Sequence, residues 1–150
     1  MEVKRKIVPP AYLFITLLLM WLMQGYFPVL QYIYPPAAYL GIAPIIFGIV
    51  IAAMAADLFK KADTGIVPFE EATTLVTDGS YRVTRNPMYL GMFLILLGVA
   101  ALLGSVGALL PFPLFVVVIR NHFVLGEERF LEAAFGTQYL DYKAKVRRWI

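Results

Sequence analysis

The stretch DGSYRVTRNPMYLGMFLILLGVA, residues 78–100, decides the fold class, because arginine, asparagine and proline lead directly into a long apolar run. No Lys, Arg, Asp or Glu occurs at positions 86–119, and none occurs at positions 7–56. A membrane-spanning helix needs about 20 such residues, so each run has room for two short helices. The chain is 61% hydrophobic and 15% charged, whereas soluble domains are roughly half apolar and a quarter charged. The sequence therefore predicts an integral membrane protein.

Prolines and glycines divide the two apolar runs. Pro35 and Pro36 interrupt the first run, because proline donates no backbone hydrogen bond and disfavours helix in the residue before it. The sequence GSVG at 104–107 predicts a turn in the second run. We therefore predict an all-α, polytopic membrane bundle in a single domain, with an amphipathic helix at its cytoplasmic C-terminal end. Its four spans are predicted near 11–30, 38–58, 88–103 and 108–125, with a loop at 59–87 and a tail at 126–150.

The distribution of basic residues predicts the orientation. Lysines and arginines lie before the first span, between the second and third, and after the fourth: Lys4, Arg5, Lys6, Lys60, Lys61, Arg82, Arg85 and those from Arg120 onward. With four spans, all of them fall on one side, which the positive-inside rule assigns to the cytoplasm. Both termini are then cytoplasmic, in the cytoplasmic membrane or the endoplasmic reticulum. A net charge of +3 indicates contacts with anionic lipids and no nucleic-acid surface.

The composition also limits the chemistry. The absence of cysteine excludes a disulfide, a thiolate nucleophile and a Cys-based metal site. His122 is the only histidine, so a histidine cluster is excluded as well, and we interpret His122 as an interfacial residue in preference to a catalytic one. The first apolar run is too long for a signal peptide, and no small-residue cleavage site follows it.

Local signals predict two helix starts and an amphipathic helix. Asn86 precedes Pro87 as an expected N-cap of the third span. Gly136 is an expected helix stop, and Thr137 an expected N-cap of the final helix. In that helix a shared apolar face is predicted for Tyr139, Tyr142, Val146 and Trp149.

The adjacent acids Glu127 and Glu128 follow the fourth span, where carboxylates are costly unless they are solvated, paired or bound to a cation. The structural interpretation is an ion pair with Arg82, Arg85 or Arg129. The functional interpretation is a compact cytoplasmic pocket, with arginine and asparagine on one wall and the two glutamates on the other. Such a pocket suits a zwitterionic or polycationic ligand.

Two segments carry a family resemblance. GSYRVTRNPMYLG, followed after a helical hairpin by EERFLEAAFGTQYLDYKAKVRRWI, resembles the isoprenylcysteine carboxyl methyltransferase family, within the broader group that includes phospholipid N-methyltransferases. The resemblance covers roughly residues 64–150. Eukaryotic members usually have Arg-His-Pro where this chain has Arg85-Asn86-Pro87, so a role that needs an imidazole does not carry over. The first two spans match no motif.

The resemblance implies an S-adenosylmethionine-dependent methyltransferase that acts on a lipophilic acceptor, with its cofactor on the cytoplasmic side. Arg85 is the expected partner of the cofactor carboxylate, and Glu127 and Glu128 are interchangeable candidates for its ammonium and ribose hydroxyls. The other expected cofactor-binding residues are Asn86, Met88, Tyr89 and Tyr139. The expected catalytic residues are Arg85, Glu128 and Tyr142, the last two as bases for an amine acceptor. The acceptor group, carboxylate or amine, stays open.

Two other functions remain as alternatives. One is an NADPH-dependent membrane reductase with a related helical core, although the chain shows no dinucleotide fingerprint. The other is a non-enzymatic lipid-binding or scaffold protein in which the arginines and glutamates form structural ion pairs.

Overall fold

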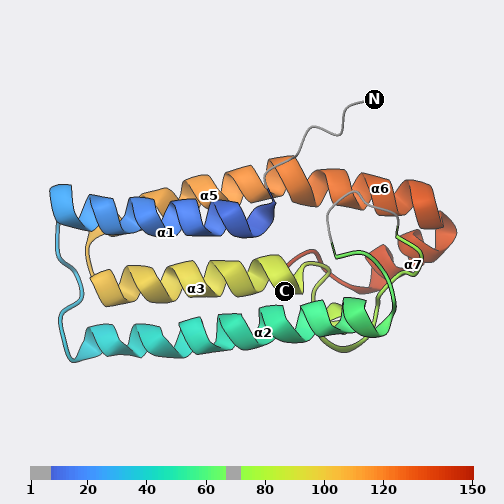
Figure 1. The fold of residues 1–150 in the computed structure, drawn as a ribbon, viewed down its shortest axis with the longest axis horizontal. Coiled ribbons are helices and arrows are strands. Elements are labelled where there is room, and N and C mark those ends of the chain that lie inside the picture. The colour runs from blue at the N-terminus through green and yellow to red at the C-terminus, as the bar shows by residue number, and fades with distance from the viewer. Residues whose placement is uncertain (1–7, 67–71) are drawn as a thin grey trace.

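The computed structural model describes residues 8–66 and 72–150, and it confirms the all-helical prediction (Figure 1). The long elements are α1 (Pro9–Tyr26), α2 (Ile42–Lys61), α3 (Pro87–Leu103) and a nearly continuous helical run. That run comprises α4 (Val106–Leu109), α5 (Pro111–Ile119), the π-turn η3 (Arg120–Val124) and α6 (Leu125–Phe135). The remaining elements are α7 (Thr137–Lys145) and the 3₁₀ turns η1 (Ala37–Gly41) and η2 (Gly79–Arg82).

Four antiparallel helices, α1, α2, α3 and α5, lie side by side along the long axis of the molecule (Figure 1). The connection from α2 to α3 lies at the same end of the bundle as α6 and α7, on the right of Figure 1. The connections from α1 to α2 and from α3 to α4 lie at the opposite end. Most of the polar sequence is therefore gathered at one end of the bundle.

Helices α1, α2 and α3 overlap the first three predicted spans, although α1 ends at Tyr26, before the predicted limit at residue 30. Gly104 ends α3 in the left-handed conformation, with φ of 72°, and the Ser105 hydroxyl accepts a hydrogen bond from the Ala108 amide. The predicted turn at 104–107 is therefore confirmed. The predicted last span, near 108–125, lies within a helical run that continues to Phe135, and the predicted helix stop at Gly136 is confirmed. The sequence EERFLEAAF contains mostly strong helix formers and no breaker.

Two predicted helix caps need correction. Asn86 occupies the N-cap position of α3, but its side chain makes no capping hydrogen bond and donates instead to the Arg148 carbonyl. Thr137 is the first residue of α7, and Gly136 is the cap. Gly136 has φ of 51°, so the sharp turn from α6 to α7 falls on the residue that tolerates it best.

The predicted apolar face of the final helix is also wrong in part. Helix α7 ends at Lys145, and Val146 is extended, with φ of −117° and ψ of 129°. Val146 and Trp149 therefore cannot share a helical face with Tyr139 and Tyr142. Trp149 instead packs on Phe93 of α3, with 5.0 Å between the ring centroids.

Within residues 8–66 and 72–150, two helices are long and apolar enough to cross a membrane, Ala37–Lys61 and Val106–Phe135, and α3 is a shorter apolar helix. Large apolar side chains are exposed on the outer faces of α1, α2 and α5, among them Phe14, Trp21, Phe47 and Leu114. An apolar surface of this extent is typical of contact with lipid or with a partner. The predicted topology signals Lys4, Arg5 and Lys6 lie outside the described residues.

Helix α3 lies at the centre of the packing, and it meets α2 through glycines. Gly91 of α3 faces Gly48 of α2, Gly98 of α3 faces Gly41 at the end of η1, and all four glycines are buried. A Cβ atom at Gly91 would lie 2.5 Å from the Gly48 carbonyl oxygen. Small residues let helix backbones approach closely, and this packing is common between helices in membranes. The two backbones are therefore in direct contact.

We expect Gly91→Leu to force α2 and α3 apart and to lower the free energy of unfolding by about 2 kcal/mol or more, as overpacking does. The measurement is the melting temperature of the purified protein in detergent. Gly25→Leu is the matched control, because a Cβ placed at Gly25 would meet no described residue within 4 Å apart from its chain neighbours and its own helix backbone. Equal melting temperatures for the two variants would contradict the glycine contact.

Candidate active site

A cavity of about 290 Å³ opens at the end of the bundle where α6 and α7 lie. Cavities that bind small molecules start at roughly 300 Å³. The lining comes from the first residues of α1 and α3, from α6 and α7, and from the connection between α2 and α3. The eight predicted site residues all line it: Arg85, Asn86, Met88, Tyr89, Glu127, Glu128, Tyr139 and Tyr142.

Most of the remaining lining is apolar. Val8, Pro9 and Pro10 contribute from the start of α1, Met92 from α3 and Phe130 from α6. The cavity thus has a largely apolar wall with a few charged groups on one side, the composition expected of a small-molecule site.

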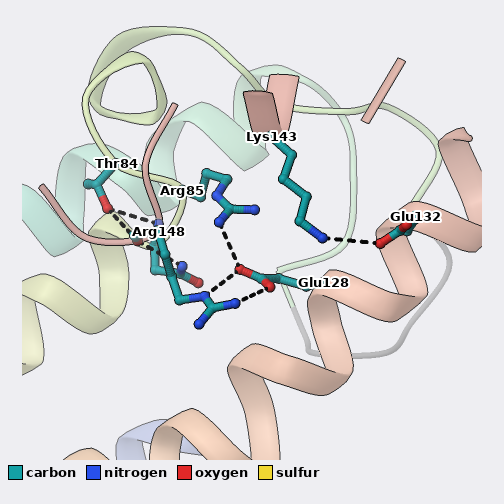
Figure 2. A network of polar contacts seen from close by, with 7 residues as sticks. Thr84, Arg85, Glu128, Glu132, Lys143 and Arg148 are labelled. Carbon is teal, nitrogen blue, oxygen red and sulfur yellow. Dashed lines mark hydrogen bonds and ion pairs between the residues drawn. The ribbon is translucent and has the colours of Figure 1, made fainter. Parts of the chain in front are cut away.

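Glu128 lies between two arginines (Figure 2). Its carboxylate accepts hydrogen bonds from Arg148 Nε and Nη2, each at 2.8 Å. Arg85 Nη2 lies 3.4 Å from Glu128 Oε1. Of the three partners considered from the sequence, only Arg85 pairs with Glu128, since Arg82 instead forms an exposed pair with Asp78 at 2.7 Å.

Sequence reasoning missed Arg148 as a partner of Glu128. Three hydrogen bonds to backbone carbonyls hold the C-terminal segment, residues 146–150, against the residues just before α3. Thr84 Oγ1 and Asn86 Nδ2 donate to the Arg148 carbonyl at 2.9 Å and 3.0 Å, and the Arg85 amide donates to the Arg147 carbonyl at 3.0 Å. Residues more than 60 positions apart are joined in this way, and no local pattern signals such a contact.

The Arg85 guanidinium is buried and incompletely paired. Its side chain is 9% exposed, and within the described part of the chain its Nε and Nη1 have no hydrogen-bond partner. A buried polar group without a partner costs about 1–3 kcal/mol, and more when it is charged. Because Arg85 lines the cavity, an anionic group of a ligand would relieve this cost.

Glu127 has different surroundings from its neighbour. Tyr89 donates its hydroxyl proton to Glu127 Oε1. Across residues 8–66 and 72–150, no Lys, Arg or His nitrogen lies within 4.0 Å of the Glu127 carboxylate. The two adjacent glutamates therefore differ: Glu128 is paired with arginines, whereas Glu127 accepts a hydrogen bond from Tyr89 and has no cationic partner among the described residues.

Tyrosines surround these charged groups. Tyr142 donates its hydroxyl proton to the Tyr81 carbonyl at 2.7 Å. Burial raises the pKa of Tyr81, of Tyr142 and, with the nearby Glu128 charge, of Tyr139. The hydrogen bond to Glu128 also raises the pKa of Arg148. At neutral pH the tyrosines are therefore protonated, and Tyr142 acts as a hydrogen-bond donor in this arrangement.

A π-turn precedes the two glutamates. Arg120–Val124 adds a residue to the helical repeat just before α6, which turns the following side chains by about 100° relative to α5. His122 lies in this π-turn, is exposed and does not line the cavity. The π-turn therefore helps to set the direction of Glu127 and Glu128.

The chain is similar to a known protein family and to several known proteins. A family model described as phospholipid methyltransferase matches residues 36–138. The protein-S-isoprenylcysteine O-methyltransferase of Schizosaccharomyces pombe is 39% identical over 72 residues, which cover 48% of this chain and 30% of that protein. A probable protein-S-isoprenylcysteine O-methyltransferase of Oryza sativa is 30% identical over 111 residues, 73% of this chain and 58% of that protein.

A third relative is shorter. A Haemophilus influenzae protein described as uncharacterized is 44% identical over 63 residues, which cover 42% of this chain and all of that protein. The chain thus matches about a third to three fifths of the length of the two methyltransferases.

We expect Tyr89→Phe to lower the free energy of unfolding by about 1–3 kcal/mol, because the substitution removes a hydrogen-bond donor from a carboxylate in the cavity. Thermal unfolding in detergent measures the change. Tyr26→Phe is the control, since Tyr26 is exposed and makes no side-chain hydrogen bond to the described residues. A Tyr89→Phe variant as stable as Tyr26→Phe would show that Glu127 does not depend on this contact.

Proposed function

Because the chain belongs to the phospholipid methyltransferase family, we propose that it is a membrane methyltransferase that uses S-adenosylmethionine and acts on a lipophilic acceptor. One observation carries the proposal. Arg85, whose Nε and Nη1 have no hydrogen-bond partner in the described residues, and Glu127, which has no cationic partner there, line the same cavity. An incompletely paired guanidinium and a carboxylate without a cationic partner in one cavity are complementary to a zwitterion.

The charged groups fit the amino-acid end of the cofactor. Arg85 presents N–H donors to a carboxylate, in the charge-assisted geometry that guanidinium groups favour. Glu127 is the carboxylate available for the ammonium group. We propose that Asn86, Met88, Tyr89 and Tyr139 surround the rest of the cofactor, since all of them line the cavity.

Glu128 is not assigned a direct contact with the cofactor. Two guanidinium groups already engage its carboxylate. We propose that Glu128 primarily holds Arg85 in place. The predicted roles of Glu128 and Tyr142 as bases for an amine acceptor would require both residues to leave their present hydrogen bonds first.

S-adenosylmethionine would supply an electrophilic methyl group on a sulfonium. For the transfer itself, the contribution of the protein is alignment of the acceptor and exclusion of water. The apolar residues Met88, Met92 and Phe130 keep the cavity dry, and the ring faces of Tyr81 and Tyr142 suit a cationic sulfur. No nucleophilic side chain is needed, which agrees with a chain that lacks cysteine.

We further propose that α1, α2, α3 and the α4–α5 run all cross the membrane, with both termini in the cytoplasm. The antiparallel arrangement and the exposed apolar side chains support this topology. The cavity then lies at the cytoplasmic ends of the helices. A lipid tail can approach its apolar wall from the bilayer, and the polar head group would reach the charged groups.

Binding of S-adenosylhomocysteine tests the function. We expect it to raise the melting temperature of the purified protein, because a ligand at 100 times its Kd adds about 2.7 kcal/mol of stability. Arg85→Gln and Glu127→Gln should each weaken the affinity about tenfold or more by titration calorimetry, since each removes a charge-assisted contact.

Arg82→Gln is the matched control, because the Arg82 side chain is exposed and does not line the cavity. NADPH should cause no shift. Stabilisation by NADPH instead of S-adenosylhomocysteine would favour the reductase alternative. Failure of the folded protein to bind S-adenosylhomocysteine would refute the proposed function.

The natural absence of cysteine allows a direct test of topology. We expect single cysteines at Arg82 and Lys145 to react with a membrane-impermeant maleimide only from the cytoplasmic side. Cysteines at Tyr34, in the connection from α1 to α2, and at Leu110, directly after α4, should react only from the other side, because both residues are exposed and both connections lie at the opposite end. Labelling of Arg82→Cys and Tyr34→Cys from the same side would contradict four spans.

A further inference from the structure

We propose that Arg148 is a positioning residue that keeps Arg85 available for an anionic ligand by neutralising Glu128. The inference rests on the proposed function, because the ligand in question is the cofactor carboxylate. It assigns to the C-terminal segment a part in the binding site, although Arg148 itself does not line the cavity.

The two arginines share one carboxylate unequally (Figure 2). Arg148 binds Glu128 with two parallel hydrogen bonds of 2.8 Å, whereas Arg85 has a single approach of 3.4 Å through Nη2. The Arg148 side chain, which is 30% exposed, makes the closer pair, whereas Nε and Nη1 of Arg85, whose side chain is 9% exposed, have no hydrogen-bond partner among the described residues.

An anion site requires a guanidinium with unpaired N–H donors, and the unequal sharing of Glu128 leaves Arg85 with such donors. A carboxylate and a guanidinium pair best through two parallel hydrogen bonds. Without Arg148, Arg85 would be the remaining arginine beside Glu128 and would turn to bind it in that geometry. A ligand carboxylate would then have to break a buried ion pair before it could bind. By occupying both oxygens of Glu128, Arg148 leaves Arg85 with donors to spare.

The role of the Arg148 side chain can be tested without unfolding the C-terminal segment, because other contacts hold that segment in place. The Arg148 carbonyl accepts hydrogen bonds from Thr84 and Asn86, and Trp149 packs on Phe93. None of these contacts uses the Arg148 side chain. A substitution that removes its charge should therefore leave the C-terminal segment in place.

The test compares two ligands that differ only in the amino-acid group attached to the thioether sulfur. S-adenosylhomocysteine has the amino-acid carboxylate and ammonium, and 5′-methylthioadenosine has the same nucleoside and sulfur without them. We expect Arg148→Gln to weaken the affinity for S-adenosylhomocysteine about tenfold, equivalent to about 1.4 kcal/mol, and to change that for 5′-methylthioadenosine less than about threefold. Arg148→Lys, which keeps the charge but loses the planar fork, should fall between wild type and Arg148→Gln.

A second substitution isolates the mechanism. In Arg148→Gln/Glu128→Gln the competing carboxylate is gone, so Arg85 is free again. We expect the affinity for S-adenosylhomocysteine to return to within about threefold of that of Glu128→Gln alone, a non-additivity typical of residues in direct contact. Arg147→Gln is the control, because the Arg147 side chain is exposed and only its carbonyl bonds to the start of α3.

The inference is overturned if Arg148→Gln weakens the affinity for both ligands equally or for neither. It is also overturned if the losses of affinity add up in the double variant. If Arg148→Gln does not fold, Arg148→Lys gives the same comparison, and equal effects on both ligands would again overturn the inference. Wild-type protein that binds S-adenosylhomocysteine while Arg148→Gln binds it equally well refutes the role of Arg148 alone. Wild-type protein that does not bind it refutes the proposed function and this inference together.

Discussion

The ion-pair network around Glu128 is the constraint on which the polar end of the structure depends. A buried carboxylate that loses its partners destabilises a protein strongly, by roughly 3–5 kcal/mol, whereas an intact pair contributes little net stability. The network therefore chiefly fixes where the residues around Glu128 lie relative to one another. It joins Arg85, just before α3, to the first turn of α6 and to the C-terminal segment, three parts of the chain that are separate in sequence.

Helix α3 carries this constraint into the apolar part of the bundle. At its middle, Gly91 and Gly98 bring its backbone against α2, and on the other side Phe93 packs against Phe115 of α5. These contacts leave α3 little freedom to shift along its axis. Its first turn, with Tyr89, is therefore held at a fixed height relative to α6, and the cavity is a consequence of packing elsewhere in the bundle.

Much of this end of the molecule was predictable from the order of segments along the chain. A turn at 104–107 makes α3 and the following helix antiparallel, so residues just before the first must lie near residues just after the second. Arg85 and Tyr89 are therefore expected near Glu127 and Glu128, and the Arg85–Glu128 and Tyr89–Glu127 contacts agree with that expectation. It needed no side-chain detail, because span lengths fix where the helices end.

The role of the C-terminal segment was not predictable in the same way. Helical periodicity suggested that Val146 and Trp149 continue the face of α7, but the carbonyls of residues 147 and 148 bond to the start of α3, and the helix stops at Lys145. Competition between a local helical pattern and non-local hydrogen bonds is decided by tertiary packing, which one sequence does not reveal. The same is true of the π-turn before α6, for which the sequence has no breaker.

The different environments of Glu127 and Glu128 follow from elementary helix geometry. Adjacent residues of a helix point about 100° apart, so two neighbouring carboxylates cannot face the same partners. Glu128 faces the arginines, which neutralise its charge, while Glu127 faces Tyr89 and has no cationic partner among the described residues. Together with Nε and Nη1 of Arg85, which also have no partner there, this leaves one incompletely paired guanidinium and one carboxylate without a cationic partner in the lining of the cavity. If both glutamates were neutralised, the cavity would select an anion, and if neither were, it would select a cation. The unequal pair is the arrangement that matches a zwitterion, and it requires the two acids to be adjacent in sequence and unlike in surroundings.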